Sequence, residues 1–509
     1  MQSVRKYAIL APVKQSEKRT EQPWYEKAAG KKPRSEKNAA KAAKKQEKKN
    51  DAAEKREKPL ARKPQAFSRS QAADGRQNLR TQTADFRAPI KSKSLSAKPL
   101  FDLSAIPSDA RAIIEQFDVL IQSVRPLSAK QQVILPQDIK TLSHQLTDES
   151  ESRRTGYMNS ASSVSAYIHY FMWWNLVRLT RLLAPLPAAA FPLTDGDAVL
   201  DIGSGPLTVP IALWLSRPEL RTKKLTVYCM DTSQNALSAG EELFLAVAAK
   251  TQCVPWKIVR VRGDLSEHIQ IKEKAALITC ANVFNEVVQK SDMPPDFLAK
   301  KYSRILLDFA RAHTDGIAAD ADDTSSILLI EPGDPKSARF ISLMRDAFIR
   351  KDYAPLSPCP HSASCPMAGR HVDKNGNFSG KWCNFAFSTA DAPEKLLTLS
   401  EKAFLSKDRA TLSFVLLSNG GVAKEQEKSR EQQKNAAWKA PLMQARITSD
   451  AIRLPEQHAT GYYACSEKGL LLLLDKKHAE PKSGDLIEVR APSENAPTDK
   501  KSGACVVTL

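Results

Sequence analysis

The sequence predicts an α/β fold built on a mainly parallel β-sheet with helices on both faces. Between residues 195 and 420, short apolar runs alternate with stretches in which apolar residues recur at helical spacing. The first apolar run ends in a glycine turn that leads into a helix ("VLDIGSGPLTVPIAL", 199–213). Such alternation favours parallel strands joined by crossover helices. We therefore expect a Rossmann-like domain over residues 191–420.

Residues 1–100 form a basic arm that we expect to be disordered. They hold 27 Lys and Arg residues against 10 Asp and Glu residues, whereas the rest of the chain holds 49 against 47. The arm is rich in Ala, Lys and Glu, so burial of apolar side chains cannot offset the entropy lost on folding. Its charge suits a polyanion, either nucleic acid or an anionic membrane surface. The alternative is that the arm only keeps the protein soluble.

Residues 101–190 predict a helical N-terminal region. One helix is indicated by "SDARAIIEQFDVLIQSV" (108–124), which starts with Ser and Asp and repeats apolar residues at helical spacing. A second is indicated by "SVSAYIHYFMWWNLVRLTRLL" (163–183). We expect its aromatic side chains to pack on the domain that follows, with stacking on nucleic acid bases as the alternative. These residues are Tyr167, Tyr170, Phe171, Trp173 and Trp174.

The strands of the predicted domain are read from its apolar runs. Five of them are "AVLDIG", "LTVYCMD", "IVRVRGD", "ALITCANV" and "SILLIEPG". Two later runs, "CNFAFST" (383–389) and "TLSFVLLS" (411–418), lack a helical crossover between them, so we expect an antiparallel hairpin at the edge of the sheet.

The glycine turn and the strand ends predict a nucleotide-type cofactor site. Glycines allow close approach of backbone to a ligand, and the following helix offers free N–H groups. Gly203 and Gly205 are present, but Leu207 replaces the third glycine of the dinucleotide fingerprint. Asp201 precedes the turn, and D-x-G-x-G is typical of class I S-adenosylmethionine-dependent methyltransferases. Ligands bind at the carboxyl ends of strands in such sheets. The expected cofactor residues are Asp201, Gly203, Gly205, Asp231, Asp264 and Asn282.

The sequence names no catalytic residue. Base N-methyltransferases carry an Asn/Asp-Pro-Pro-aromatic motif after the fourth strand, where this chain has "CANVFNEVV" (280–288). Cys280 could be a nucleophile, but the surrounding motif of such enzymes is absent, so we interpret it as a core thiol. Asn285 and Glu286 are expected to line the site together with Asn282.

Three of the eight cysteines fall between residues 359 and 383 and indicate a metal site. The spacing C-x5-C is wider than that of most zinc sites, and Cys-Pro pairs recur at iron–sulfur sites. Cys465 is the best fourth ligand, ahead of Cys505, and His361 and His371 are alternatives if the metal is zinc. The expected metal ligands are Cys359, Cys365, Cys383 and Cys465, within and beyond a cysteine-rich segment at 356–390. Such a site would tie the C-terminal part of the chain to the Rossmann-like domain.

The C-terminal part predicts a small β unit. Residues 421–440 read as a linker, residues 441–495 alternate like strands, and residues 496–509 read as a tail. No secretion signal and no apolar run long enough for a membrane span are visible, so we expect a cytoplasmic protein, with a mitochondrial matrix as the alternative.

Several motifs in this order resemble a methyltransferase-like family that acts on the small ribosomal subunit. The family includes a mitochondrial small-subunit assembly factor and its bacterial relatives. The resemblance covers roughly residues 100–490. Its motifs are "SVSAYIHYFMWWNLVRL", "LDIGSGPLTVPIALW", "ANVFNEV", "LLIEPGDP", "CPHSASCP" and "WCNF".

The resemblance implies a function. It implies S-adenosylmethionine at the glycine turn and strand-end acids, and a structural [4Fe–4S] cluster on the four cysteines, with zinc as the alternative. It implies small-subunit ribosomal RNA as the partner, in ribosome biogenesis and translation. We expect a monomer that binds no membrane. Whether it is an rRNA methyltransferase or a non-catalytic RNA-binding assembly factor stays open, with the enzyme favoured.

Overall fold

A computed structural model describes residues 96–147, 158, 160–265, 269, 271–311, 324–367, 380–420, 442–493 and 495–509. The predicted basic arm lies outside these residues, apart from its last five. So does His371, one of the alternative zinc ligands, and so does the predicted linker.

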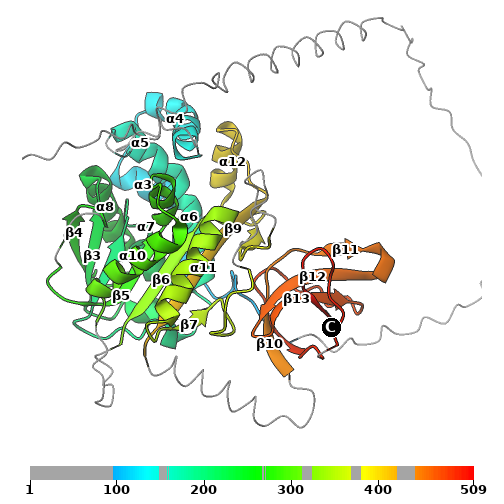
Figure 1. Cartoon of the computed structure of the whole chain (residues 1–509). Coiled ribbons are helices and arrows are strands. Elements are labelled where there is room, and N and C mark those ends of the chain that lie inside the picture. Colours follow the sequence, from blue (N-terminus) through cyan, green and yellow to red (C-terminus); the bar gives the residue numbers. More distant parts are fainter. Residues whose placement is uncertain are drawn as a thin grey trace, which may run out of the picture. The chain divides into compact units, whose positions relative to one another are not determined.

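The larger sheet confirms the predicted Rossmann-like class I methyltransferase fold. Its strands run in the order β4-β3-β2-β5-β6-β9-β7, and β8 pairs with β9 (Figure 1). Strands β4, β3, β2, β5 and β6 are parallel, whereas β9 is antiparallel to both of its neighbours. The bounds are β2 Ala198–Ile202, β3 Thr226–Asp231, β4 Lys257–Arg262, β5 Ala275–Ala281, β6 Ser326–Glu331, β7 Ala354–Ser357, β8 Phe385–Ser388 and β9 Arg409–Ser418.

The expected hairpin is right in its pairing and wrong in its position. Strands β8 and β9 pair antiparallel, as predicted. However, β9 lies inside the sheet, because the short run just before Cys359 forms β7 and pairs with the other side of β9. The apolar content of β9 agrees with this, since residues 412–418 are all buried.

Helices cover both faces of this sheet, and side chains that alternate along each strand form two separate cores. Leu200 and Ile278 belong to one core, with α9, α10 and α11. Val199 and Val227 belong to the other, with α7, α8 and the N-terminal helices. The helix bounds are α7 Thr208–Ser216, α8 Gln234–Lys250, α9 Phe284–Gln289, α10 Pro295–Phe309, α11 Pro335–Ile349 and α12 Glu394–Lys402.

The predicted N-terminal helical region is confirmed with two local differences. The first predicted helix is interrupted at Gln116 and forms α2 (Ser108–Glu115) and α3 (Phe117–Val124), followed by α4 (Ala129–Thr147). The second is continuous but changes its winding. It begins as α5 (Ala161–Ala166), passes through a π-helical turn (Tyr167–Met172) and continues as α6 (Trp173–Leu183). Such π-turns are rare in proteins as a whole, and those that occur often lie at functional sites.

The smaller sheet forms the predicted C-terminal β unit, here called the small β domain. Its strand order is β1-β14-β10-β12-β13-β15, and β11 pairs with β12. Its bounds are β1 Ala97–Lys98, β10 Leu442–Ile447, β11 Ile452–Leu454, β12 Ala459–Ser466, β13 Gly469–Asp475, β14 Leu486–Arg490 and β15 Cys505–Thr508.

Two strands extend the small β domain beyond its predicted limits. β1 comes from residues assigned to the arm and pairs with β14, while β15 comes from residues assigned to the tail and pairs with β13. Apolar side chains hold both ends, since Leu100 is buried and Val507 packs against the core of this domain. None of the helices in the described ranges is both long and apolar enough to cross a bilayer.

Candidate cofactor site and cysteine centre

The glycine turn joins β2 to α7 through three residues with positive φ. Gly203 (φ 65°), Gly205 (φ 51°) and Leu207 (φ 58°) adopt left-handed backbone conformations, which strain a residue that has a Cβ atom. A Cβ at position 203 would lie 2.4 Å from Val283 Cγ2, so the turn approaches the segment after β5 too closely for a side chain. A Cβ at position 205 would meet no atom within 4 Å. The turn therefore leaves open space beside Gly205.

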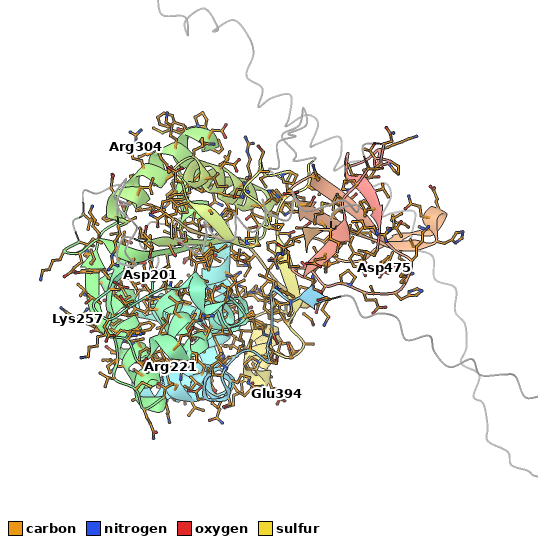
Figure 2. The ribbon with its side chains drawn as sticks, turned by 90° about the horizontal axis from the view of Figure 1, so that it is seen from below. Asp201, Arg221, Lys257, Arg304, Glu394 and Asp475 are labelled. Atoms are coloured by element: carbon orange, nitrogen blue, oxygen red, sulfur yellow. The ribbon has the colours of Figure 1, made fainter. Side chains whose placement is uncertain are left out.

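Asp201 holds this turn from beneath. It is 1% exposed, and its two carboxylate oxygens accept hydrogen bonds from Ser204 Oγ and Thr279 Oγ1, both at 2.5 Å. Burial raises the pKa of Asp201 to about 7, although both hydrogen bonds oppose the rise. Figure 2 shows Asp201 inside the α/β domain, whereas Lys257 and Arg304 project from its surface. Through these two contacts Asp201 ties the glycine turn to β5 and fixes the position of the turn.

Asp231, at the end of β3, connects the turn to the next helix. Its Oδ2 accepts from the Gly205 backbone N–H at 2.8 Å, and its Oδ1 accepts from the Ser233 N–H at 2.8 Å. Ser233 in turn caps α8 by accepting from the Ala236 N–H. Burial raises the pKa of Asp231 above its ordinary value. The carboxylate is only half-buried and lies beside the open space at Gly205.

The turn also rests directly on α8. A Cβ at Gly240 would lie 2.3 Å from the carbonyl carbon of Pro206 and 2.7 Å from the Leu207 nitrogen. Only glycine at this position allows the backbone of the turn to touch the helix. Gly240 gives no signal in the sequence, because a glycine inside a helical pattern has no motif of its own.

The remaining predicted residues lie at the same edge of the sheet. Asp264 follows β4 and is exposed, and its charge contributes to the raised pKa of Tyr302 after the larger effect of burial. Asn282 follows β5 with φ 58°, and its N–H donates to the Ile330 carbonyl at 2.8 Å. Because β4, β3, β2 and β5 are adjacent and parallel, the structure brings all six predicted residues to one edge.

Glu331 is a buried acid at this edge that the sequence analysis missed. It ends β6, is 0% exposed, and accepts the backbone N–H groups of Val283, Phe284 and Asn285 at 2.8–3.1 Å. It therefore caps α9 from outside the helix. Burial raises the pKa of Glu331 to about 8, against the effect of these hydrogen bonds. The signal available in the sequence was an acid directly after the apolar run of residues 327–330.

A cavity of about 290 Å³ opens beside Glu331. It lies between the start of α9 and the start of α11, and Phe284, Asn285, Asp334 and Phe340 contribute to its walls. Asn285, which the sequence placed at the site, therefore lines this cavity.

The π-helical turn borders the site from the helical region. Tyr170 and Trp174 are buried and donate to Leu405 and Ser400 of the following domain, as predicted, whereas Trp173 is buried against α2 and α3 of the helical region itself. Tyr167 and Phe171 are only half-buried, and their rings stack with centroids 5.7 Å apart. Burial, followed by the charge of Asp231, raises the pKa of Tyr167 to about 12, so this phenol lies near the strand-end acid.

Arg178 follows on the same side of this helix. It donates to Asn175 Oδ1 at 2.6 Å and to the Thr411 carbonyl at 3.0 Å, and it interacts electrostatically with Glu331. Aromatic and polar side chains of this helix thus lie near the strand-end acids Asp231 and Glu331.

The four predicted metal ligands come together at a second place, here called the cysteine centre. Cys359, Cys365 and Cys383 lie between β7 and β8, and Cys465 lies on β12 of the small β domain. Burial raises the pKa of the Cys383 thiol well above its ordinary value, and the sulfurs of the other three raise it further. Burial likewise raises the pKa of Cys465, with added effects of Cys359 and Cys365. Each of the four cysteines therefore lies within electrostatic reach of the others, and Cys465 packs with Cys365 and Cys383.

Cys465 and Cys505 lie on opposite faces of the small β domain, which agrees with the prediction of Cys465 as the fourth ligand. Cys465 packs with Cys365, Cys383 and Met367, whereas Cys505 packs in the core on the other face of the sheet. His361 is 4% exposed, and its Nε2 lies 3.2 Å from Cys465 Sγ. In the parts of the chain that the structure describes, no three His, Cys, Asp or Glu side chains are grouped as for a metal ion.

Comparison with known proteins identifies one family. A family model described as "Mitochondrial small ribosomal subunit Rsm22" matches residues 161–447, more than half of the 509 residues. Its name agrees with the mitochondrial alternative rather than with the expected cytoplasmic location. No curated protein matches the chain.

Solved structures similar to this chain include several methyltransferases of low identity. A precorrin-6y C5,15-methyltransferase from Geobacter metallireducens GS-15 is 9% identical, with a TM-score of 0.25 over 45% of this chain and 82% of that one. A putative class I S-adenosylmethionine-dependent methyltransferase from Listeria monocytogenes is 11% identical, with a TM-score of 0.27 over 62% and 88%. A methyltransferase from Geobacter sulfurreducens, in complex with S-adenosyl-L-homocysteine, is 15% identical, with a TM-score of 0.24 over 48% and 89%. The strand order, rather than these values, carries the assignment of the fold.

Proposed function

The chain belongs to the Rsm22 family of mitochondrial small ribosomal subunit proteins, and from this premise we propose that it binds small-subunit ribosomal RNA during ribosome assembly and holds S-adenosylmethionine at its glycine turn. The observation that carries the cofactor assignment is the open space beside Gly205, next to the half-buried carboxylate of Asp231. In this proposal Asp231 accepts from the ribose hydroxyls, and Asp264 accepts from the adenine amino group.

The residues present fit this cofactor. Gly205, which has no side chain, borders the open space, and the N-terminus of α7 supplies backbone N–H groups. Acids lie at the ends of successive strands. When bound, S-adenosylmethionine supplies an electrophilic methyl group. Asp201 keeps the turn in place through Ser204 and Thr279.

The cavity beside Glu331 is the proposed place for the methyl acceptor. Its walls combine the apolar Phe284 and Phe340 with the polar Asn285, a mixture that suits a flat, partly polar group such as a nucleobase. Tyr167 and Phe171 offer a half-exposed stacked pair at the border of the site, and aromatic side chains commonly stack on unpaired bases.

Calorimetry of the full chain with S-adenosylmethionine tests the cofactor assignment. We expect saturable binding that is weakened by Asp231→Asn and unchanged by Asp296→Asn, an exposed acid on α10. Absence of binding by the intact protein would remove the basis of the proposal. Transfer of labelled methyl groups to small-subunit RNA then separates an enzyme from a binder.

The second candidate function is a non-catalytic RNA-binding assembly factor. The observation that favours it is the segment after β5, which holds Asn282, Val283 and Phe284 in place of the Asn/Asp-Pro-Pro-aromatic motif. Under this alternative the protein binds RNA with and without the cofactor, and no label is transferred.

The basic arm is proposed to contact RNA. The affinity for RNA should then fall steeply with salt, because bound cations release counterions from phosphates. Removal of residues 1–95, which leaves β1 intact, should reduce that salt dependence. A variant that keeps the arm but replaces its lysines with glutamine separates charge from length. An unchanged salt dependence in both variants would assign the RNA contact to another surface.

We further propose that the cysteine centre holds a [4Fe–4S] cluster, with zinc as the alternative occupant. One buried and three half-buried cysteines from two domains form a soft donor set that suits either group. In this role the group would link the Rossmann-like domain to the small β domain. Anaerobically purified protein should be brown and should bleach with dithionite, whereas a colourless protein with stoichiometric zinc would exclude the cluster. Cys465→Ser should lose the metal, and Cys505→Ser should keep it.

A further inference from the structure

Two buried arginines, one from each domain, converge on the cysteine centre. We propose that Arg345 and Arg446 are positioning residues of this centre, which hold the loop between Cys359 and Cys365 in its ligating form and stabilise the negative charge of the thiolate-bound cluster. This inference rests on the proposed cluster and goes beyond it, because it assigns to named side chains the control of its retention and reduction potential.

Arg345 approaches the centre from α11 of the Rossmann-like domain. It is 2% exposed, and its Nε donates to Cys359 Sγ at 3.2 Å. One terminal nitrogen donates to the carbonyls of His361 and Ala363 at 2.7 and 2.9 Å, and the other pairs with Asp346 at 2.7 Å. One side chain therefore contacts the first ligand and two carbonyls of the loop that leads to the second.

Arg446 approaches the same loop from β10 of the small β domain. It is 8% exposed, and its Nε donates to the carbonyl of Pro358, the residue before Cys359, at 2.8 Å. Another of its nitrogens donates to the Gly484 carbonyl at 2.7 Å. In the sheet, Arg446 lies directly opposite Cys465 on β12. This arginine therefore joins β10, the neighbour of the fourth ligand's strand, to the start of the loop.

Together the two guanidinium groups interact electrostatically with all four cysteines. Arg345 interacts electrostatically with Cys359 and Cys365, and Arg446 interacts with Cys359, Cys383 and Cys465. Burying a charge is costly unless an opposite charge or hydrogen bonds compensate it. Asp346 and Asp485 each offset part of this positive charge. Four thiolates outweigh the charge of a [4Fe–4S] core, so the loaded centre supplies the remaining negative charge.

The arrangement has two separable consequences. Positive charge and N–H donation to the sulfurs favour the reduced, more negative state of a cluster, and therefore raise its reduction potential. Hydrogen bonds to the loop hold the ligands in place, and loss of such partners typically weakens metal affinity by roughly 10- to 100-fold. Lysine in place of arginine would keep the charge but could not reproduce the planar, multiple donation.

The experiment compares the full-length wild-type protein with Arg345→Gln, Arg345→Lys, Arg446→Gln and Arg446→Lys, all purified anaerobically. Redox titration followed by electron paramagnetic resonance gives the potential, and the rate of iron transfer to a chelator gives retention. The Gln variants should have a more negative potential and lose iron about tenfold faster or more. The Lys variants should lose iron faster, with a smaller change of potential. Arg350→Gln, which removes an exposed charge just beyond α11, should match the wild type in both measurements.

The outcomes separate the two levels of the proposal. A wild-type protein without iron and sulfide overturns the cluster and this inference together. A wild-type cluster whose potential and retention are unchanged in all four variants overturns the role of the arginines alone. If a Gln variant does not fold, the corresponding Lys variant decides through its retention, and an unchanged rate of iron loss refutes the role of that residue.

Discussion

Gly240→Ala is the change that tests most directly how the glycine turn is held. Gly240 lies inside α8 and is buried, and in an ordinary helix interior alanine is more favourable than glycine by about 1 kcal/mol. Here the added Cβ would lie 2.3 Å from the Pro206 carbonyl carbon and 2.7 Å from the Leu207 nitrogen. These are backbone atoms of the turn, so relief of the clash must move the turn itself. Overpacking of this kind costs about 1–3 kcal/mol, and we take the upper end because backbone must shift.

The two effects oppose each other, and the clash should win. Subtracting the gain in helix propensity leaves a net loss of about 2 kcal/mol in the free energy of unfolding. Urea unfolding at equilibrium measures this loss, and calorimetry should show weakened S-adenosylmethionine binding by the same variant. Leu245→Ala on the exposed side of α8 should change stability by less than about 0.5 kcal/mol. If Gly240→Ala is more stable than the wild type, the close contact between the turn and α8 is not present in solution.

Three further predictions concern the same edge of the sheet. Gly205→Ala should lower the free energy of unfolding by only about 1–2 kcal/mol, from its left-handed φ, yet abolish cofactor binding because its Cβ points into the open space; unchanged binding by calorimetry would show that the cofactor lies elsewhere. Asp231→Asn should weaken S-adenosylmethionine binding about tenfold, as expected for the loss of a charged acceptor, and should lower the melting temperature because an amide cannot accept from both the Gly205 and the Ser233 N–H. The pKa of Asp201 is raised from 3.8 to about 7, so the folded state holds this proton more tightly and the associated stability is lost as pH rises from about 4 through about 7. Asp201→Asn should remove that part of the decline in urea unfolding at about pH 4.5 and about pH 8, and an equally steep decline in the variant would contradict the assignment.

The general architecture was predictable because it depends on patterns that the chain shows locally. Apolar runs followed by helical spacing predict parallel strands whatever the details of packing, and the acids Asp201, Asp231 and Asp264 mark strand ends or turns. Cys465 could be singled out because it stands between polar and turn residues, and in the structure it packs with Cys365 and Cys383, while its role as a ligand stays a prediction.

What the sequence could not reveal depends on contacts between distant segments. Glu331 caps α9 across the sheet edge, and Gly240 accommodates a turn that lies more than 30 residues earlier. Arg446 contacts a carbonyl 88 residues away. Neither an isolated acid, nor a helical glycine, nor a strand arginine has a periodic signal. The predicted edge position of β9 was wrong for a related reason. Strand β7 pairs with the outer side of β9, and its apolar run is too short to be recognised in the sequence.

The pairing of β1 with β14 has a consequence for the order of folding. Ala97 and Ile487 are partners in the small sheet, so nearly all of the described chain lies inside the loop that this pair closes. Contacts between such distant residues form slowly, because the entropy of closing a long loop is lost before any contact stabilises it. During synthesis from the N-terminus, β1 must wait unpaired until the last strands emerge, while the Rossmann-like domain can already fold. We therefore expect the capture of β1 by β14 to come late in folding.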